Sequence, residues 1–509
     1  MKNRINSFLV FVLVFLTVSC ENNFDEINTN TVDPTSDVVD PVYIINNAII
    51  GLSFPSGTNI YYDAGVVQQI VTPNSGIISG ANFNQDNRDV SDDQWQDYYE
   101  NVIKHTSDVI NQISEASDRV NLLSITRIVE AYAFSVLTDE YGDIPYFEAG
   151  KGFSDQVVLP AYDQQQVIYL DLIKELNEAI AALSDGADKI DGEIMYGGNL
   201  DQWRRLGNSL LLRIGMRLSK VDVSLAQQTV ANAFSSGVME SNDDNFVVRH
   251  DNNFTNPYGG VFNGGEANNF YLVESFIDFL STNNDPRLAA LAIRYVGATS
   301  GPGQTLEIAS KDPADQVGMP MGFDNSTIGQ AVADRGLASF YDFSQVDRFT
   351  IGANSAPMFL CTYGQTQLLL AEAATRGWIA GNPASFYENG VRAHMEQLAA
   401  YGENSTISNT DIDAYLANNL FDGANAYEQI NNQYWVASFL NGPEAFANFR
   451  RSGFPELTPN PYPGQDISSD FIHRLTYPDS EIAVNKANLD AAVGRMGPDK
   501  LDTRVWWDN

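Results

Sequence analysis

The sequence predicts a mostly α-helical fold, a tetratricopeptide-like superhelix of stacked helix pairs that carries a large, irregular, loop-rich portion. Two observations lead to this prediction. Apolar residues recur at helical spacing in four separate regions, and long stretches rich in Gly, Asn, Asp and aromatic residues lie between them. Because a helix pair cannot bury its apolar face alone, pairs that recur along a chain are expected to stack on one another.

The first helical region covers about residues 95–140. Its second half forms one wide apolar face, which contains Ile125, Ile128, Val129, Tyr132, Ala133, Val136 and Leu137. The helix should end at Tyr141-Gly-Asp-Ile-Pro145, because Gly and Pro stop helices. A preceding helix over about 95–116 is expected to pack antiparallel to it.

Three further regions have the same periodicity, at about 164–221, 363–400 and, less regularly, 411–450. We therefore expect helical repeats over about 95–221 and 363–450. The segments 52–92 and 235–355 lack helical periodicity. Loop-rich insertions of this size in a compact protein are usually functional.

Composition narrows the range of partners. The chain has 509 residues and a formal net charge of −36. A surface this negative repels phosphate backbones, so nucleic acid is not expected to bind. Acidity of this degree is typical of an exported protein that has to stay soluble.

The first twenty residues indicate export and lipid anchoring. Lys2 and Arg4 precede an apolar run over 8–18, which is too short to span a bilayer but has the length of a signal-peptide core. Leu16-Thr-Val-Ser-Cys20 resembles a bacterial lipobox. We predict a signal peptide over 1–19, lipidation of Cys20 that anchors the chain to a membrane, a flexible polar tether over 20–41 and one folded domain over 42–509.

Several motifs, in order along the chain, resemble the SusD/RagB family, SusD-like branch. They are the helix from Arg127 to Pro145, the segment Trp203–Arg213, Asn284-Asp-Pro-Arg287, Phe449–Pro455, Arg474-Leu-Thr-Tyr-Pro478 with Glu481 and Asn485, and Arg504-Val-Trp-Trp-Asp508.

This resemblance implies about four tetratricopeptide-like helix pairs in an outer-membrane lipoprotein on the surface of a Bacteroidetes cell. It implies that the protein is not an enzyme, and that its irregular portion binds an oligosaccharide nutrient and delivers it to a SusC-like TonB-dependent barrel. Uptake of a peptide by the same route is the alternative.

Sugar binding requires flat apolar faces beside amide and carboxylate groups, and the loop-rich segments supply both. The other interpretation of each aromatic residue is that it packs its own loop onto the scaffold. The candidate ligand-binding residues are Phe83, Phe254, Tyr258, Phe262, Phe323, Asn325, Phe340 and Tyr341.

A glycoside hydrolase on a helical scaffold is the enzymatic alternative, since two carboxylates at a set separation carry that chemistry. Asp139, Glu140 and Asp143 cluster in the sequence, but on a helix-end motif. Neither a phosphate-binding loop nor a Gly-x-Ser-x-Gly elbow occurs. We therefore predict no catalytic residues.

Metal binding has weak support. The four histidines match no ligand spacing. Asn242-Asp-Asp-Asn245 offers oxygen ligands that suit Ca²⁺ but lacks a full calcium-loop pattern, so a solvated turn is the preferred interpretation. No cofactor is predicted, and a structural calcium ion is the alternative.

Some residues are better read as structural. Cys361 lies in an apolar stretch and is interpreted as a buried small hydrophobe. Trp95 and Trp203 stand at helical spacing and are predicted to lie in the scaffold core. Trp506 and Trp507 should hold the C-terminal segment down, and Arg450 and Arg451 should form structural ion pairs.

Overall fold

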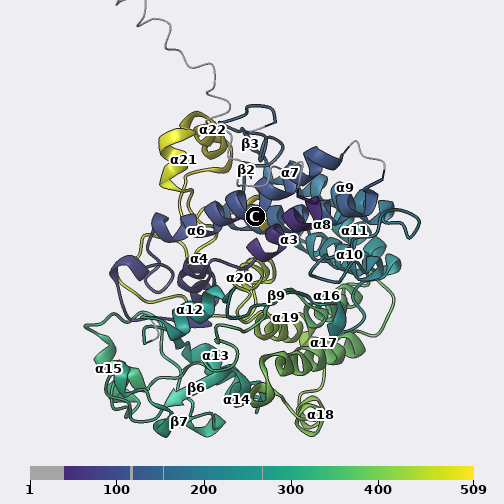
Figure 1. Cartoon of the computed structure of the whole chain (residues 1–509). Helices are drawn as coiled ribbons and strands as arrows, with labels where there is room; N and C mark the ends of the chain where they lie inside the picture. Colours follow the sequence, from purple (N-terminus) through teal and green to yellow (C-terminus); the bar gives the residue numbers. More distant parts are fainter. Residues whose placement is uncertain (1–38, 115–117, 153, 266–267) are drawn as a thin grey trace, which may run out of the picture.

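The computed structural model describes residues 39–114, 118–152, 154–265 and 268–509. Cys20, the signal peptide and nearly all of the tether predicted from the sequence lie outside these residues. The described chain is mostly helical (Figure 1). The predicted fold class, a mostly helical stack with a loop-rich portion, is confirmed.

Consecutive helices contact one another in a continuous stack. The first part of this stack contains α3 (Pro41–Gly51), α6 (Arg88–Tyr98), α7 (Lys104–Ile113), α8 (Val120–Tyr141), α9 (Gln165–Ala182), α10 (Leu200–Arg217) and α11 (Val223–Ser236). The second part contains α16 (Tyr363–Thr375), α17 (Pro383–Gln397), α18 (Asn409–Asn418), α19 (Ala426–Ala437) and α20 (Gly442–Ser452). Because α16 packs against α10 and α11, the two parts form one scaffold although more than a hundred residues separate them in the chain.

The first helix pair differs from the sequence prediction in its bounds. The helix expected over 95–116 begins at Arg88, continues through a π-helical turn at Tyr99–Ile103 and ends at Ile113. Its partner ends at Tyr141 as expected, and Gly142 follows with a φ of 86°, a conformation that glycine adopts without strain.

Two scaffold helices were not predicted. Asp40 caps α3 through Val42 N–H, and Pro41 occupies its first turn, a favourable position for proline. The buried face of α11 consists of Ala226, Thr229, Val230 and Ala233. These small side chains give a weak hydrophobic periodicity, so the sequence pattern alone does not mark this helix.

The loop-rich segments contain short helices, namely α4 (Ser56–Thr58), a π-helix (Asn59–Asp63), α5 (Ala64–Val66), α12 (Pro257–Asn263), α13 (Glu274–Thr282), α14 (Arg287–Leu291) and α15 (Ile328–Asp334). Short antiparallel strands join them: β1 (Ile70–Val71) with β5 (Tyr271–Leu272), β2 (Ile144–Pro145) with β3 (Tyr162–Asp163), β4 (Phe246–Val248) with β9 (Met358–Cys361), and β6 (Ala292–Tyr295) between β7 (Ala309–Ser310) and β8 (Gln345–Val346). The pairing of β4 with β9 means that the long insertion leaves the scaffold and returns to it at one place.

The core is one large cluster of buried apolar side chains along the helices, and two smaller clusters lie within the insertion. Among the described residues, α8 alone is long and apolar enough to cross a membrane, but 78% of its most apolar window is buried in the protein. It is the central helix of the core. The last helices, α21 (Asp479–Val484) and α22 (Lys486–Met496), lie together at one end of the molecule (Figure 1).

Candidate functional site

Three of the predicted ligand-binding residues are buried. Phe83, Tyr258 and Phe262 are 1, 2 and 4% exposed. The ring of Phe83 lies 4.4 Å from that of Tyr462, and the Tyr258 and Phe262 rings lie 6.3 Å apart on α12. These rings therefore contribute mainly to packing, although Tyr258 also lines a cavity.

The remaining predicted residues form separate groups. Phe254 is half-buried and stacks on His250, with ring centroids 4.8 Å apart. Phe323 and Phe340 are half-buried against the smaller apolar cluster around α15, and Tyr341 lies beside Phe340. Asn325 is exposed. The structure thus pairs Tyr258 with Phe262 and Phe340 with Tyr341 but does not join the whole set into one surface.

Two cavities lie where the insertion meets the end of α17, and their walls share Pro357, Phe359 and Gln397. We call this pair of cavities the recess. The outer cavity is open and has a volume of about 410 Å³, whereas the inner one is a narrow void of about 20 Å³.

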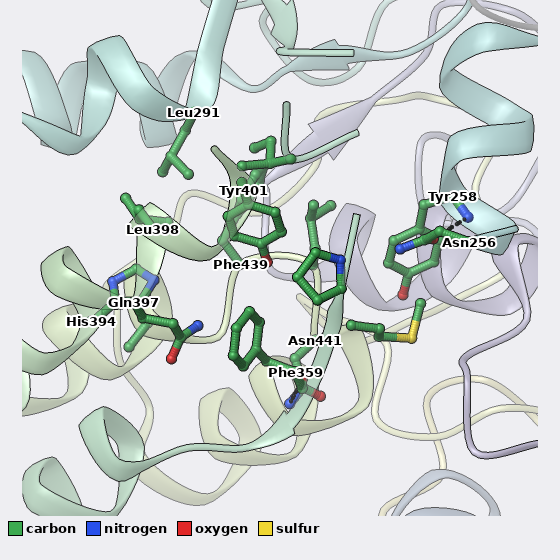
Figure 2. A pocket seen from close by; sticks show the side chains of 15 residues that line it. Asn256, Tyr258, Leu291, Phe359, His394, Gln397, Leu398, Tyr401, Phe439 and Asn441 are labelled. Atoms are coloured by element: carbon green, nitrogen blue, oxygen red, sulfur yellow. Dashed lines mark hydrogen bonds between the residues drawn. The ribbon is translucent and has the colours of Figure 1, made fainter. Parts of the chain in front are cut away.

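Aromatic rings and amides face each other across the inner part of the recess (Figure 2). Tyr258 and Asn256 lie on one side, His394 and Gln397 lie on the other, and Phe359 with Asn441 lies between them. Tyr401 and Phe439 complete the aromatic lining. The outer cavity adds Asn242, Asn245, Arg249, His250, Ser355 and Glu396.

Asparagine side chains hold the insertion wall in place. Asn256 caps α12 by accepting from Tyr258 N–H at 2.8 Å, and its Nδ2 donates to the carbonyl of Ala356 at the same distance. A Cβ on Gly259 would lie 2.5 Å from the Cα of Asn354, so only glycine allows α12 to approach this loop so closely. The opposite loop is fixed by Asn441, whose Nδ2 donates to the carbonyls of Phe359 and Leu360.

The loop between α19 and α20 is strained at the recess. Leu440 lines the inner cavity with a φ of 62°, a left-handed conformation that is rare for a branched residue. Such strain persists where the surroundings enforce it, and it is most frequent at ligand-binding and active sites. It places Phe439 and Asn441 on the recess wall.

Neutral groups line the inner recess. Burial, together with the neighbouring Arg287, holds the pKa of His394 well below its usual range, so this imidazole is uncharged at neutral pH. Burial also lowers the pKa of His250 and raises that of Tyr401. Charged side chains line the outer cavity, where Arg249 and Glu396 are exposed. The recess can therefore stack on apolar ring faces and exchange hydrogen bonds with neutral polar groups.

The predicted carboxylate cluster lies elsewhere, at the end of α8. Asp139 accepts from Trp507 Nε1 at 2.9 Å and pairs with Arg217, while Asp143 pairs with Arg495 at 2.9 Å. Glu140 is buried beside Asp63. These contacts join α8 to α9, α10 and the C-terminal segment, which is a structural arrangement. In the described lining of the recess, Glu396 is the one carboxylate.

The other structural interpretations can now be compared with the fold. Cys361, Trp95, Trp203 and Trp507 are buried as predicted. Arg451 forms a two-bond pair with Glu372 at 2.8 and 2.7 Å, as expected.

The prediction for Arg450 was wrong. Among the described residues it forms no ion pair, and it instead donates to the carbonyls of Asp139 and His473 and lies over the Trp507 ring at 4.8 Å. Tryptophan faces attract guanidinium groups, so a buried Arg does not need a carboxylate.

The segment Asn242–Asn245 is part of a 3₁₀ turn. Ser241 caps it, and Asp244 pairs with Arg205 at 3.2 Å, so part of the turn is buried rather than solvated. Over the described ranges, no group of three or more His, Cys, Asp or Glu side chains is arranged to hold a metal ion. The calcium alternative stays a prediction.

Several recess residues were not predicted from the sequence. Phe359 lies in the stretch that was interpreted only as the surroundings of Cys361, and Tyr401 and Phe439 follow helices. An aromatic residue directly after a helix, as in Ser438-Phe-Leu-Asn-Gly-Pro443, is a usable signal, because such a residue cannot pack along the helix face.

The fold and the recess are those of a helical-repeat protein with a ligand-sized cavity, and comparisons identify its family. A family model described as SusD-like, "starch-binding associating with outer membrane", matches residues 33–478. A solved chitin-binding protein is 30% identical, with a TM-score of 0.81 over 92% of this chain and 100% of the other. A Bacteroidetes SusD-like protein is 26% identical, with a TM-score of 0.80 over 92% and 100%.

A chitin-binding SusD homologue from Flavobacterium johnsoniae has the same fold, with 23% identity and a TM-score of 0.76 over 92% of this chain and 98% of the other. No curated protein matches the chain in sequence. The chain belongs to the SusD-like family, whose members associate with the outer membrane.

Proposed function

We propose that this protein binds an oligosaccharide in the recess at the cell surface and delivers it to a SusC-like TonB-dependent transporter. The observation that carries the proposal is the lining of the recess, where half-buried Phe359, Tyr401 and Phe439 lie beside the amides of Gln397 and Asn441. Pyranose rings stack on such faces while amides bind their hydroxyl groups.

Membership of the family and the chitin-binding relative support a glycan ligand. The neutral inner wall is consistent with an uncharged sugar, because His394 carries no charge at neutral pH. The outer cavity, about 410 Å³, is within the range of small-ligand sites.

Attachment to the membrane and the transporter partner rest on other grounds. The lipobox-like Leu16–Cys20 supports a lipid anchor at Cys20. The family resemblance supports a SusC-like barrel as the transporter partner. A direct test is to purify the full-length protein from bacterial outer membranes: we expect an acylated Cys20 by mass spectrometry and a co-purified TonB-dependent barrel. An unmodified Cys20 would contradict the anchor.

A peptide is the second candidate ligand, and the rim of the recess favours it. Arg249 and Glu396 offer opposite charges beside the outer cavity, an arrangement that suits a zwitterionic peptide. In addition, no Trp occurs in the described lining of either cavity.

Calorimetry on the folded domain tests both candidates. The ligands are oligomers of N-acetylglucosamine, cellulose-type and starch-type oligosaccharides, and a panel of short peptides. We expect one glycan class to bind, and Phe359→Ala to weaken it about tenfold, because burial of a phenylalanine side chain is worth roughly 1.5–3 kcal/mol.

Phe147→Ala is the matched control, since Phe147 is 42% exposed and lies in a different region, near α8 and α9. It should leave affinity unchanged. Binding of peptides alone would favour the second candidate, and equal losses in the two variants would overturn the assignment of the recess.

A further inference from the structure

A second open cavity lies on the scaffold, between α13, α17, α18 and α19, and we call it the scaffold cleft. Its volume is about 410 Å³. Tyr387 of α17 lies in its wall, whereas His394 at the other end of the same helix lines the recess. The two cavities are therefore separate sites along one helix.

Three asparagine amide nitrogens in the scaffold cleft are already engaged. Nδ2 of Asn283 donates to the carbonyl of Phe279 at 2.7 Å, and Nδ2 of Asn419 donates to that of Tyr415 at 3.0 Å. Nδ2 of Asn425 donates to Asp422 at 2.8 Å. Among the described residues, no donor reaches the Oδ1 atoms of these three side chains, so each presents a free acceptor.

Asn432 adds a further acceptor. Its Oδ1 is shielded from solvent and has no partner within the described part of the chain. A buried acceptor that lacks a hydrogen bond costs free energy, which a bound donor would recover. Asn432 is half-buried in the wall of the cleft, so a rotation of its side chain would present this oxygen to a bound donor.

The charges of the cleft favour a cation. Asp422 and Glu428 line it, and its described lining contains no Lys or Arg. Arg287 lies close behind Gln433, to which it donates at 2.6 Å, but its own charge is neutralised by the buried Asp285. A ligand rich in donors and carrying positive charge would match these walls.

The aromatic part of the lining favours a sugar over an isolated ion. Phe279 is half-buried in the wall, and the lining also contains Tyr387 and Tyr415. Apolar ring faces next to several separated acceptors suit a molecule that combines C–H faces with hydroxyl and amino donors.

We propose that the scaffold cleft is a second saccharide site, selective for sugars that carry a free amino group. The ammonium group binds among Glu428, Asp422 and the oxygen of Asn432, and the hydroxyl groups donate to the remaining amide oxygens. This site is independent of the recess, so it can exist whichever ligand the recess takes.

A buried polar wall separates the two sites. Arg287, from the Asn284-Asp-Pro-Arg287 motif, contacts His394 Nδ1 at 3.1 Å on the recess side and Gln433 on the cleft side. Asp285 fixes the guanidinium in this position. The motif thus supports both cavities while keeping them apart.

Three tetrasaccharides that differ only at C2 provide the test. They are β-1,4-linked oligomers with an ammonium, an N-acetylamino or a hydroxyl group at that carbon. We expect calorimetry to detect the ammonium form at the scaffold cleft, with affinity that falls as salt is added. Glu428→Gln and Asn432→Ala should each weaken it about tenfold, since hydrogen bonds to charged groups are the stronger ones.

Glu456→Gln is the matched control, because Glu456 is exposed and lies outside the cleft. It should leave the affinity unchanged. Unaltered thermal unfolding of the cleft variants would show that they fold.

The outcomes separate the two sites. If the ammonium form binds and only the cleft variants weaken it, the scaffold cleft is supported even if the recess binds no glycan. Equal affinity for the hydroxyl form, no effect of Glu428→Gln, or binding of a lysine-rich peptide in place of the sugar would each overturn the proposal.

Discussion

The helical scaffold and the loop-rich insertion are stabilised in different ways. In the scaffold, buried charged side chains connect helices: Glu444 binds Arg217 at 2.6 Å, and Glu372 binds Arg451. In the insertion, buried pairs such as Asp285 with Arg287 also occur, but many side-chain oxygens accept from backbone N–H groups. Asp324 accepts from Ser326 and Thr327, and Asp342 accepts from Gly297.

The difference follows from the backbone. A helix satisfies most of its own N–H and C=O groups, so the polar side chains of the scaffold are free to link one helix to another. A loop has no such ladder, and its Asp and Asn residues have to complete its hydrogen bonds. Polar side chains in loops are therefore not automatically available to a ligand.

The largest expected effect breaks a buried pair in the scaffold. Arg451→Met removes both of its bonds to Glu372 and leaves that buried carboxylate with Arg376 as its remaining cation, so we expect a loss of about 3 kcal/mol in the free energy of unfolding. Urea denaturation measures it. A loss below 1 kcal/mol would show that the scaffold does not depend on its buried charges.

The dependence of stability on pH tests the same buried pair. Burial alone would raise the pKa of Glu372, but Arg451 and Arg376 outweigh it and lower this pKa to about 2. The contribution of Glu372 to stability is thus present above the ordinary glutamate pKa and is lost as the pH falls through about 2. Arg451→Met should weaken this part of the acid dependence, while Arg376, which stays 2.8 Å from Glu372, maintains the rest.

The next effect concerns the buried pair of Asp63 and Glu140. Burial raises the pKa of Asp63 to about 8, despite the nearby Arg450, and raises that of Glu140 well above its usual range. The native state holds protons that the unfolded state releases near pH 4, so the free energy of unfolding should fall between pH 4 and 8, by up to about 1.4 kcal/mol per pH unit for each proton held.

Unfolding at a series of pH values in wild type and Asp63→Asn measures this dependence. The variant should show a shallower decline, and Asp470→Asn, at an exposed position, should follow the wild type. Identical slopes in Asp63→Asn and the wild type would contradict the assignment.

A smaller effect is expected in the insertion. Asn256→Ala removes the cap of α12 and the bond to Ala356, and the loss should be about 1–2 kcal/mol of unfolding free energy. Ligand affinity at the recess should fall as well, because Tyr258 and the loop before Pro357 depend on this side chain. An Asn256→Asp variant, which keeps the cap, should recover most of the stability.

The smallest effect tests an exposed pair of the scaffold. Arg127 binds Glu178 at 2.6 Å, but half of the Glu178 side chain is exposed. Glu178→Gln should cost only about 0.5 kcal/mol, and less at high salt. A loss of unfolding free energy as large as that of Arg451→Met would show that buried and exposed ion pairs contribute equally to stability.

The sequence alone was sufficient to predict the long scaffold helices. Apolar residues recur at helical spacing over several turns from Ile125 to Leu137 and from Trp203 to Leu218. The sequence did not predict α11, because the buried residues of this helix are small and give a weak apolar pattern. The irregular character of the insertion was predictable from its composition, but its short strands were not, since β4, β5 and β8 pair with partners far along the chain.

Local sequence also fails to predict which aromatic residues are buried. Phe83 and Phe254 have similar polar neighbours in sequence, yet Phe83 is buried while Phe254 is half-exposed. The difference arises because Asn460 binds the carbonyls of Ala81 and Asn82 and brings Tyr462 over the Phe83 ring. Local sequence cannot report a contact made almost 400 residues away.

The buried indole of Trp507 bears on when this protein can fold. Its Nε1 donates to Asp139, 368 residues earlier, and its ring lies beneath the Arg450 guanidinium. Contacts of such long range form late, since a large loop has to close first. The central helix therefore lacks its last partner until residue 507 has been made. The core of the protein is therefore incomplete until the C-terminal segment has joined α8.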